Sequence, residues 1–128
     1  MMQGVLPKMR RQGQGAIVNV SSGATFGACT AVGAYTSSKA ALNMLSDAAR
    51  IELTEAGIAV STIYPFVAET EFYGSVQTGE SAAEAELEGV GSEIHSRDRV
   101  AEKILRLVRS GERQDDLVPK AFGASLGV

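Results

Sequence analysis

Three residues of the sequence, Ser22, Tyr35 and Lys39, have the types and the spacing to carry out proton-transfer chemistry together. Tyr35 and Lys39 are four positions apart, which places two side chains on one face of a helix. Ser22 lies 13 positions before Tyr35, just after a short apolar run. A serine hydroxyl can hydrogen-bond a reacting oxygen, a phenol can exchange a proton with it, and an adjacent ammonium favours the ionised phenol. The trio therefore predicts acid–base chemistry at one oxygen atom.

The pattern around these residues predicts a strand, a helix and a second strand. Residues 16–20 form an apolar run, residues 34–56 carry apolar side chains at helical spacing, and residues 58–64 are rich in β-branched residues. The expected apolar positions of the helix are Ala41, Leu42, Leu45, Ala48, Ala49 and Leu53. Gly57 suits the left-handed position after the helix, and Pro65 ends the second strand. Such a right-handed crossover unit brings the carboxyl ends of both strands to one edge of a parallel sheet.

Further elements are expected on both sides of this unit. Residues 1–11 have a weak helical pattern, and residues 96–110 are expected to form a helix that ends at Gly111. The apolar stripe predicted for this second helix consists of Val100, Ile104, Leu105 and Val108. Residues 117–118 are expected in a short third strand. The intervening residues 69–96 are irregular and acidic, and we interpret them as a substrate lid because long connections are usually functional or disordered.

The strand end and the Tyr-x-x-x-Lys spacing resemble the short-chain dehydrogenase/reductase family. Its signature, a strand that ends in two serines and is followed by Y-x-x-x-K, is matched by V-S-S at residues 20–22 and by Tyr35 to Lys39. The resemblance covers nearly the whole chain. It implies an α/β fold, namely a partial Rossmann-like, doubly wound parallel sheet of about three strands with flanking helices, in a single domain of residues 1–128. It also implies NAD(P)-dependent interconversion of a secondary alcohol and a carbonyl, with NAD or NADP as cofactor.

The resemblance also implies roles for individual residues. Ser22 would hydrogen-bond the substrate oxygen, Tyr35 would be the general acid or base, and Lys39 would support the phenolate and bind the nicotinamide ribose. The residues implied in cofactor binding are Tyr35, Lys39, Pro65, Val67, Ala68 and Thr70. Phe66 stands where the family has a glycine. The local cofactor contact is expected to differ there, because a residue with a Cβ resists a positive φ.

The Gly-rich turn that holds a dinucleotide pyrophosphate in this family is not found in the sequence. We therefore interpret the chain as the C-terminal, catalytic half of the domain and expect it to be inactive by itself. The alternative is a non-enzymatic protein, either a truncated relative that serves as an interaction module or an incomplete gene product. An upstream reading frame that encodes a strand, a Gly-rich turn and a helix would favour the enzyme.

Composition argues against several other classes of partner. The net charge is −3 with no cluster of lysine and arginine, so neither nucleic acid nor an anionic membrane is expected. No apolar stretch approaches the roughly 20 residues of a membrane span, and the single cysteine, Cys29, suits a reducing cytoplasm. His95, the only histidine, is expected to be solvated, and no ordered set of metal ligands is present. The expected partners are a small alcohol or carbonyl substrate and, as the resemblance implies for the long helix, other copies of the chain.

Overall fold

The structure is a computed structural model that describes residues 1–28, 32–68 and 94–119. Its elements, in chain order, are α1 (Met2–Gln12), β1 (Gly15–Val20), the 3-10 helix η1 (Gly23–Phe26), α2 (Gly33–Leu53), the 3-10 turn η2 (Thr54–Ala56), β2 (Ile58–Tyr64), β3 (Val67–Ala68), β4 (Ile94–His95), α4 (Arg97–Ser110) and β5 (Gln114–Asp116). Most of the expected lid, 69–96, lies outside the described residues, as do Thr70 and Cys29.

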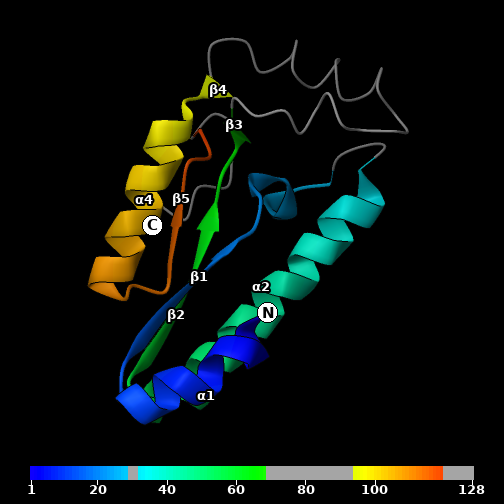
Figure 1. The fold of residues 1–128 in the computed structure, drawn as a ribbon. Helices are drawn as coiled ribbons and strands as arrows, with labels where there is room; N and C mark the ends of the chain where they lie inside the picture. Colours follow the sequence, from blue (N-terminus) through cyan, green and yellow to red (C-terminus); the bar gives the residue numbers. More distant parts are fainter. Residues whose placement is uncertain (29–31, 69–93, 120–128) are drawn as a thin grey trace.

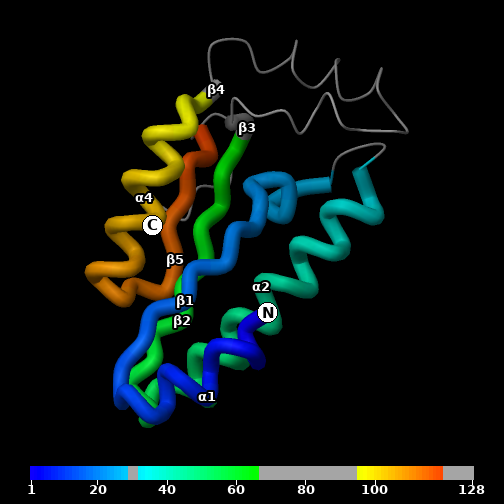
Figure 2. The backbone as a smooth tube through the Cα atoms, in the orientation of Figure 1, coloured from blue at the N-terminus to red at the C-terminus, as the bar shows by residue number. Residues whose placement is uncertain are grey.

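Three parallel strands form the main sheet, in the order β1-β2-β5. The pairing of β1 with β2 runs from Gly15 opposite Ile58 to Val20 opposite Ile63, and β5 joins the other edge of β2. Figure 1 shows α2 and α4 on opposite sides of this sheet, and the tube in Figure 2 follows β1 and β2 side by side along their length. The expected strand, helix and strand are thus confirmed, as is the three-stranded parallel sheet with helices on both faces.

The core on the α2 side of the sheet forms because alternate residues of a strand point to the same face. Ile58 and Val60 of β2 pack there with Ala49 and Leu53 of α2, and all four are at most 9% exposed. Partly buried side chains of α1, β1 and η2 complete this cluster, namely Met2, Leu6, Met9, Ile17 and Ala56. Burial of each large apolar side chain contributes about 1.5–3 kcal/mol to the free energy of folding. The same cluster contains residues of α1 and α2, so it holds both helices on one face of the sheet.

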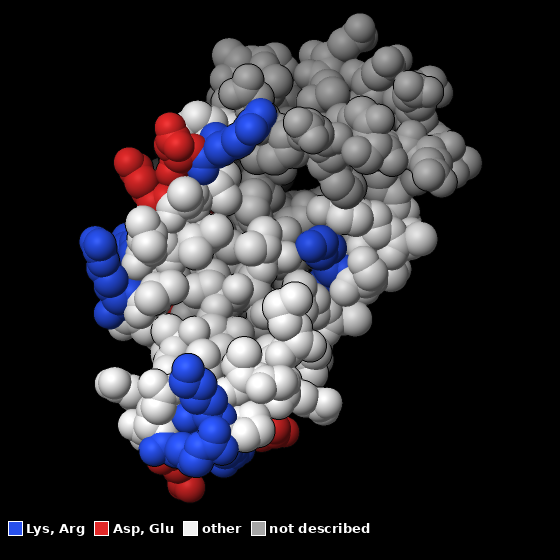
Figure 3. All heavy atoms as spheres, in the orientation of Figure 1, with Lys and Arg blue, Asp and Glu red and all other residues white. Residues whose placement is uncertain are grey.

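Charged side chains form no continuous surface on the face shown in Figure 3. Lysine, arginine, aspartate and glutamate lie there in small separate groups, mostly along the margins of the molecule. This view agrees with a sequence in which basic residues are not clustered.

Left-handed glycines stand where the sequence predicted them, although α2 itself ends at Leu53 and Gly57 caps the 3-10 turn η2 that follows, whereas Gly111 caps α4. Gly57 has φ +70° and Gly111 has φ +66°, and each N–H caps the preceding turn. Gly57 is required for a second reason as well, since a Cβ there would lie 2.3 Å from the carbonyl oxygen of Gly13. Both positions favour glycine because other residues rarely adopt a positive φ.

The helix faces differ in part from those expected. In α2 the predicted positions Leu42, Ala49 and Leu53 are at least half-buried, whereas Leu45 is 54% exposed. Ala41 and Ala48 are exposed as well. The sheet covers a narrower stripe than the apolar pattern suggested, and that stripe includes the buried hydroxyl of Ser46. The wider apolar pattern is therefore divided between the core and the surface.

The stripe predicted for α4 is wrong at two of its four positions. Leu105 and Val108 are 52% and 44% exposed, whereas Leu107, which the prediction omitted, is fully buried. Val100 and Ile104 are half-buried as expected. Positions 100, 104 and 107 follow a spacing of four and three, so they form the stripe that faces the sheet.

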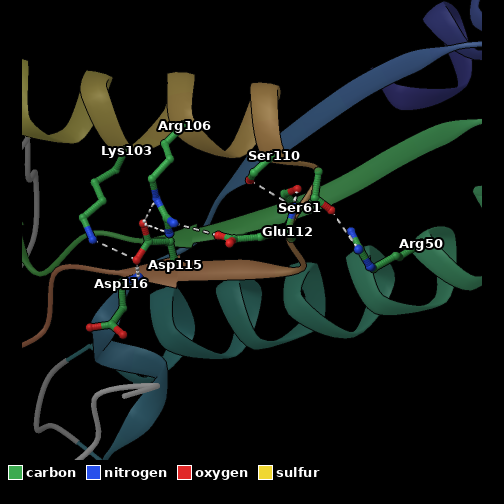
Figure 4. Close-up of polar contacts among 9 residues, drawn as sticks. Arg50, Ser61, Lys103, Arg106, Ser110, Glu112, Asp115 and Asp116 are labelled. Atoms are coloured by element: carbon green, nitrogen blue, oxygen red, sulfur yellow. Dashed lines mark hydrogen bonds and ion pairs between the residues drawn. The ribbon is translucent and has the colours of Figure 1, made fainter. Parts of the chain in front are cut away.

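The third strand lies before the position expected for it. The prediction placed it at 117–118, but β5 consists of the polar residues Gln114–Asp116. This polar run forms a strand because its backbone pairs with β2 and because Asp115 forms ion pairs with Lys103 and Arg106 of α4 (Figure 4). The apolar pair Leu117 and Val118 is buried directly after the strand. The backbone N–H of Leu117 still donates to the carbonyl of Tyr64 at 3.0 Å, so hydrophobicity located the buried end of this segment but not the polar residues that begin the strand.

Candidate active site

Ser22 lies where β1 ends and η1 begins, in a segment we call the serine turn (residues 21–26). Its side chain is nearly buried, with 7% of the residue exposed. Its Oγ accepts a hydrogen bond from the backbone N–H of Ala24 at 3.2 Å and so caps η1. That bond uses an oxygen lone pair and leaves the hydroxyl hydrogen for donation. The residue therefore caps the local backbone and still retains its donor.

The serine turn packs tightly against the carboxyl end of β2. The backbone N–H of Ser21 donates to the carbonyl of Ile63 at 2.8 Å, and that of Gly23 donates to the carbonyl of Pro65 at 2.7 Å. A Cβ on Gly23 would lie 2.6 Å from a methyl carbon of Val118. Sequence reasoning missed this role of Gly23, because contacts with Pro65 and Val118 are distant in the chain.

Tyr35 and Lys39 are both half-buried on the first turns of α2. The Nζ atom of Lys39 lies 5.8 Å from the centre of the Tyr35 ring. The same Nζ donates to the backbone carbonyl of Val20 at 2.9 Å. The structure thus places the ammonium beside the phenol and joins it to the strand end that leads into Ser22.

The other predicted cofactor-binding residues follow β2. The carbonyl of Pro65 accepts from the serine turn, as described above. Val67 and Ala68 form β3, whose parallel partner is β4, with Val67 opposite Ile94 and Ala68 opposite His95. Their backbone is therefore held in a second, two-stranded sheet directly after the strand that ends beside Ser22.

The expectation that His95 is solvated is wrong. The residue is 9% exposed, and its Nε2 lies 2.7 Å from the carbonyl oxygen of Leu117. Nε2 donates this bond in the tautomer that carries its hydrogen there. The pairing of β4 with β3 brings the ring into the interior. No local pattern predicts a two-residue strand, so the sequence offered no signal for this burial.

Tyr64 is a second tyrosine near the serine turn, and its surroundings suit a neutral phenol. Its ring packs on that of Phe26, with 4.8 Å between ring centres. Burial raises the pKa of Tyr64, and the negative charge of Asp47 raises it further. The Tyr64 phenol is therefore shielded from solvent and kept protonated, so a substitution of Tyr64 is a control for a substitution of Tyr35.

Several other kinds of site find no support in the described part of the chain. It contains no group of three or more histidine, cysteine, aspartate or glutamate residues that could hold a metal ion. None of its helices is long and apolar enough to cross a membrane. A surface depression on α4 includes no candidate site residue; it is lined by Glu102, Leu105, Arg106, Arg109 and Ser110.

Comparison with known proteins decides the family. A family model described as short chain dehydrogenase matches residues 1–81. The chain belongs to the short-chain dehydrogenase family. This result confirms the resemblance found in the sequence.

Individual relatives of this short-chain dehydrogenase chain are named as oxidoreductases. The probable oxidoreductase EphD of Mycobacterium tuberculosis is 34% identical over 119 residues, and the match covers 84% of this chain and 20% of EphD. The uncharacterized oxidoreductase YbbO of Escherichia coli is 39% identical over 88 residues, with 69% of this chain and 33% of YbbO covered. The chain thus spans a third or less of these relatives.

A solved structure supports the fold. The short-chain dehydrogenase from Sphingobium yanoikuyae in complex with NADPH superposes with a TM-score of 0.73 at 24% identity. The match covers 90% of this chain and 42% of that protein. At this identity the likeness establishes a shared Rossmann-like architecture, and the NADPH belongs to the other protein.

Proposed function

We propose that this chain provides the catalytic half of an NAD(P)-dependent oxidoreductase that interconverts a secondary alcohol and a carbonyl. The observation that carries the proposal is the placement of Lys39. Its ammonium lies beside the Tyr35 ring and donates to the carbonyl of Val20, two residues before Ser22. Family membership supports the same function.

The proposed chemistry assigns one task to each of the three side chains. In the direction of reduction, the Ser22 hydroxyl donates a hydrogen bond to the carbonyl oxygen of the substrate, and Tyr35 transfers its phenolic proton to that oxygen. The Lys39 ammonium stabilises the phenolate that remains. A bound reduced nicotinamide supplies the hydride to the carbonyl carbon. Oxidation of the alcohol reverses each step, so Tyr35 then accepts the proton.

The residues present fit the nicotinamide end of such a cofactor. They lie beyond the carboxyl ends of β1 and β2, where open α/β sheets bind ligands. Lys39 has three N–H donors, so it can keep its bond to Val20 and still donate to a ribose hydroxyl. The backbone of Val67 and Ala68 would contact the nicotinamide, and Thr70, which the resemblance also implicates, lies outside the described residues. The Gly-rich turn that would hold the pyrophosphate is not found in this sequence.

The proposal is tested in the intact domain, meaning residues 1–128 joined to a dinucleotide-binding half of the same family. Turnover of NADPH or NADH is measured against a panel of carbonyl compounds. Tyr35→Phe is expected to remove nearly all turnover because it deletes the proton donor, and Lys39→Ala to lower both cofactor affinity and rate. Tyr64→Phe is the matched control, since it deletes a buried phenol hydroxyl and is expected to keep turnover. Near-normal turnover in Tyr35→Phe would refute the assignment.

We also propose that copies of the chain associate in a cytoplasmic setting. α2 exposes an apolar stripe in which Met44 is 70%, Leu45 54% and Ile51 79% exposed. A second copy of the same helix is the proposed occupant, because exposed apolar side chains of one helix can pack against the same side chains of its copy in a twofold arrangement. Light scattering of the chain should show an oligomer that Leu45→Glu converts to a monomer. A wild-type monomer would contradict this part of the proposal.

A further inference from the structure

Polar contacts join β1 to α2 beside the candidate catalytic residues. Asn19 of β1 donates to the hydroxyl of Ser46 at 2.8 Å. Two residues further along, the hydroxyl of Ser21 donates to the side-chain oxygen of Asn43. Lys39 makes a third contact, with the carbonyl of Val20, described above. Tyr35, Lys39 and Asn43 follow one another at a spacing of four residues, so Asn43 lies on the same stripe of α2 as the two candidate catalytic residues.

Asn43 closes a network of hydrogen bonds around Ser22. Its amide oxygen accepts from Ser21, and its Nδ2 donates to the hydroxyl of Thr25 at 3.2 Å. The Thr25 hydroxyl then donates to the backbone carbonyl of Ser22 at 2.8 Å. The Ser21 hydroxyl donates to Asn43, and the Thr25 hydroxyl accepts from Asn43 and donates to the Ser22 carbonyl, so no hydroxyl has to donate twice. The residues on both sides of Ser22 are thereby tied to a single side chain of α2.

We propose that Asn43 is a positioning residue that fixes the Ser22 hydroxyl relative to Tyr35. This proposal rests on the function proposed above, because it assigns Ser22 and Tyr35 to one reacting oxygen. An amide suits the position because it accepts from Ser21 and donates to Thr25 at once. Aspartate would accept from both hydroxyls, so Thr25 would turn its hydrogen away from the Ser22 carbonyl. Leucine has a similar shape and makes neither bond.

The first arm of the test is a double-mutant cycle on turnover in the intact domain. Asn43→Leu is expected to lower kcat by roughly 10- to 100-fold, because a small misplacement of a catalytic group has an effect of this order. The KM for the cofactor should stay within about twofold. In a Ser22→Ala background, Asn43→Leu should change kcat little further, since the group that it positions is already absent. Asn43→Asp should have an intermediate effect.

Ser46→Ala is the matched control, because it removes the neighbouring β1–α2 hydrogen bond without touching the serine turn. It should lower the melting temperature by about as much as Asn43→Leu does and leave kcat unchanged. The positioning role would be overturned if Asn43→Leu reduced kcat no more than Ser46→Ala, or if its effect on kcat persisted in full in the Ser22→Ala background.

The second experiment does not measure turnover. It therefore tests the role of Asn43 independently of the proposed function. Hydrogen exchange of the Ala24 and Thr25 amides, which donate to Ser22, should accelerate roughly tenfold in Asn43→Leu and stay unchanged in Ser46→Ala. Unchanged exchange in Asn43→Leu would refute the positioning role. If Ser22→Ala itself left turnover intact, the proposed function would fail, and the exchange result would still decide whether Asn43 holds the turn.

Discussion

Two turns of this protein are held in place by different kinds of bond. The serine turn at the carboxyl end of the sheet is tied down by neutral hydrogen bonds from Ser21, Asn43 and Thr25. The other turn, residues 111–113 between α4 and β5, we call the return turn, and it is held mainly by charged groups. The comparison teaches that the serine turn depends on fixed geometry, whereas the return turn depends on charge.

The return turn shows how arginine side chains satisfy backbone carbonyls. Arg50 donates to the carbonyl of Val60 at 2.7 Å and to that of Gly111 at 2.8 Å, which joins α2, β2 and the return turn. Arg113 forms a two-bond ion pair with Asp47 of α2. Figure 4 shows Arg50 beneath the turn, together with the ion pairs of α4 and β5. Charge-assisted bonds of this kind respond to pH and salt, in contrast to neutral bonds between buried groups.

The largest effect is expected from overfilling the serine turn. Gly23→Ala would place a Cβ 2.6 Å from a Val118 methyl and 3.3 Å from the Pro65 carbonyl oxygen. We expect it to lower the free energy of unfolding by about 3 kcal/mol and to reduce turnover of the intact domain, because Ser22 must move. Gly27→Ala is the control, since a Cβ there meets nothing within 4 Å. Equal stability of the two variants by urea denaturation would contradict the tight packing described here.

A smaller effect is expected from removing the main support of the return turn. Arg50→Met keeps much of the side-chain stem but leaves the carbonyls of Val60 and Gly111 without their donor. The expected loss is about 2 kcal/mol of unfolding free energy with little change in kcat, because the serine turn is untouched. Arg109→Met, at an exposed position of α4, should be neutral. A greater loss of kcat in Arg50→Met than in Gly23→Ala would break the distinction between the two turns.

The smallest effect is a dependence of stability on acid pH that originates in the ion pairs of the return turn and of β5. Hydrogen bonding to Arg113 lowers the pKa of Asp47 below its usual value of 3.8. Burial raises the pKa of Asp115, but its hydrogen bonds with Lys103 and Arg106 outweigh this, so the pKa of Asp115 is also lowered from 3.8. Since the folded-state pKa values lie below the unfolded ones, this stabilisation is present above about pH 4 and is lost as pH falls through the lowered values.

Melting temperatures measured between about pH 6 and pH 2 test this account. The fall in melting temperature at low pH should be smaller in Asp47→Asn and in Asp115→Asn than in the wild type. Each variant lacks one carboxyl whose protonation destabilises the folded state. Asn43→Asp offers a contrast, since it introduces a carboxyl on α2 beside the serine turn. A wild-type decline that both asparagine variants reproduce in full would show that other groups control acid stability.

The sequence predicted the parts of the fold that follow from local pattern. The strand of residues 16–20, the long helix, the strand of residues 58–64 and the left-handed Gly57 all depend on neighbouring residues, and the structure confirms them. The polar strand β5 was missed because its stability comes from Asp115 pairing with cations of another element. Local periodicity contains no information about such a partner.

The candidate site was predicted unevenly for the same reason. The Tyr-x-x-x-Lys spacing is a helical pattern, so the proximity of Tyr35 and Lys39 could be predicted, and the structure shows it. Gly23 and Asn43 have no local signal. Their contacts reach Val118 and Ser21, which are brought close only by the completed sheet. Sequence pattern therefore revealed the residues proposed for the chemistry and not those that hold them in place.

The central claim, that Tyr35 provides the proton for reduction of a carbonyl by a nicotinamide, is tested most directly by isotope transfer in the intact domain. NADPH or NADH in which both hydrogens at C4 are deuterium is incubated with a carbonyl compound that the domain turns over, and the alcohol product is analysed by mass spectrometry and NMR. The account predicts one deuterium on the carbinol carbon with the wild type and with Tyr64→Phe, and almost no labelled product with Tyr35→Phe. Labelled alcohol formed at the wild-type rate by Tyr35→Phe, or product without deuterium from the wild type, would contradict it.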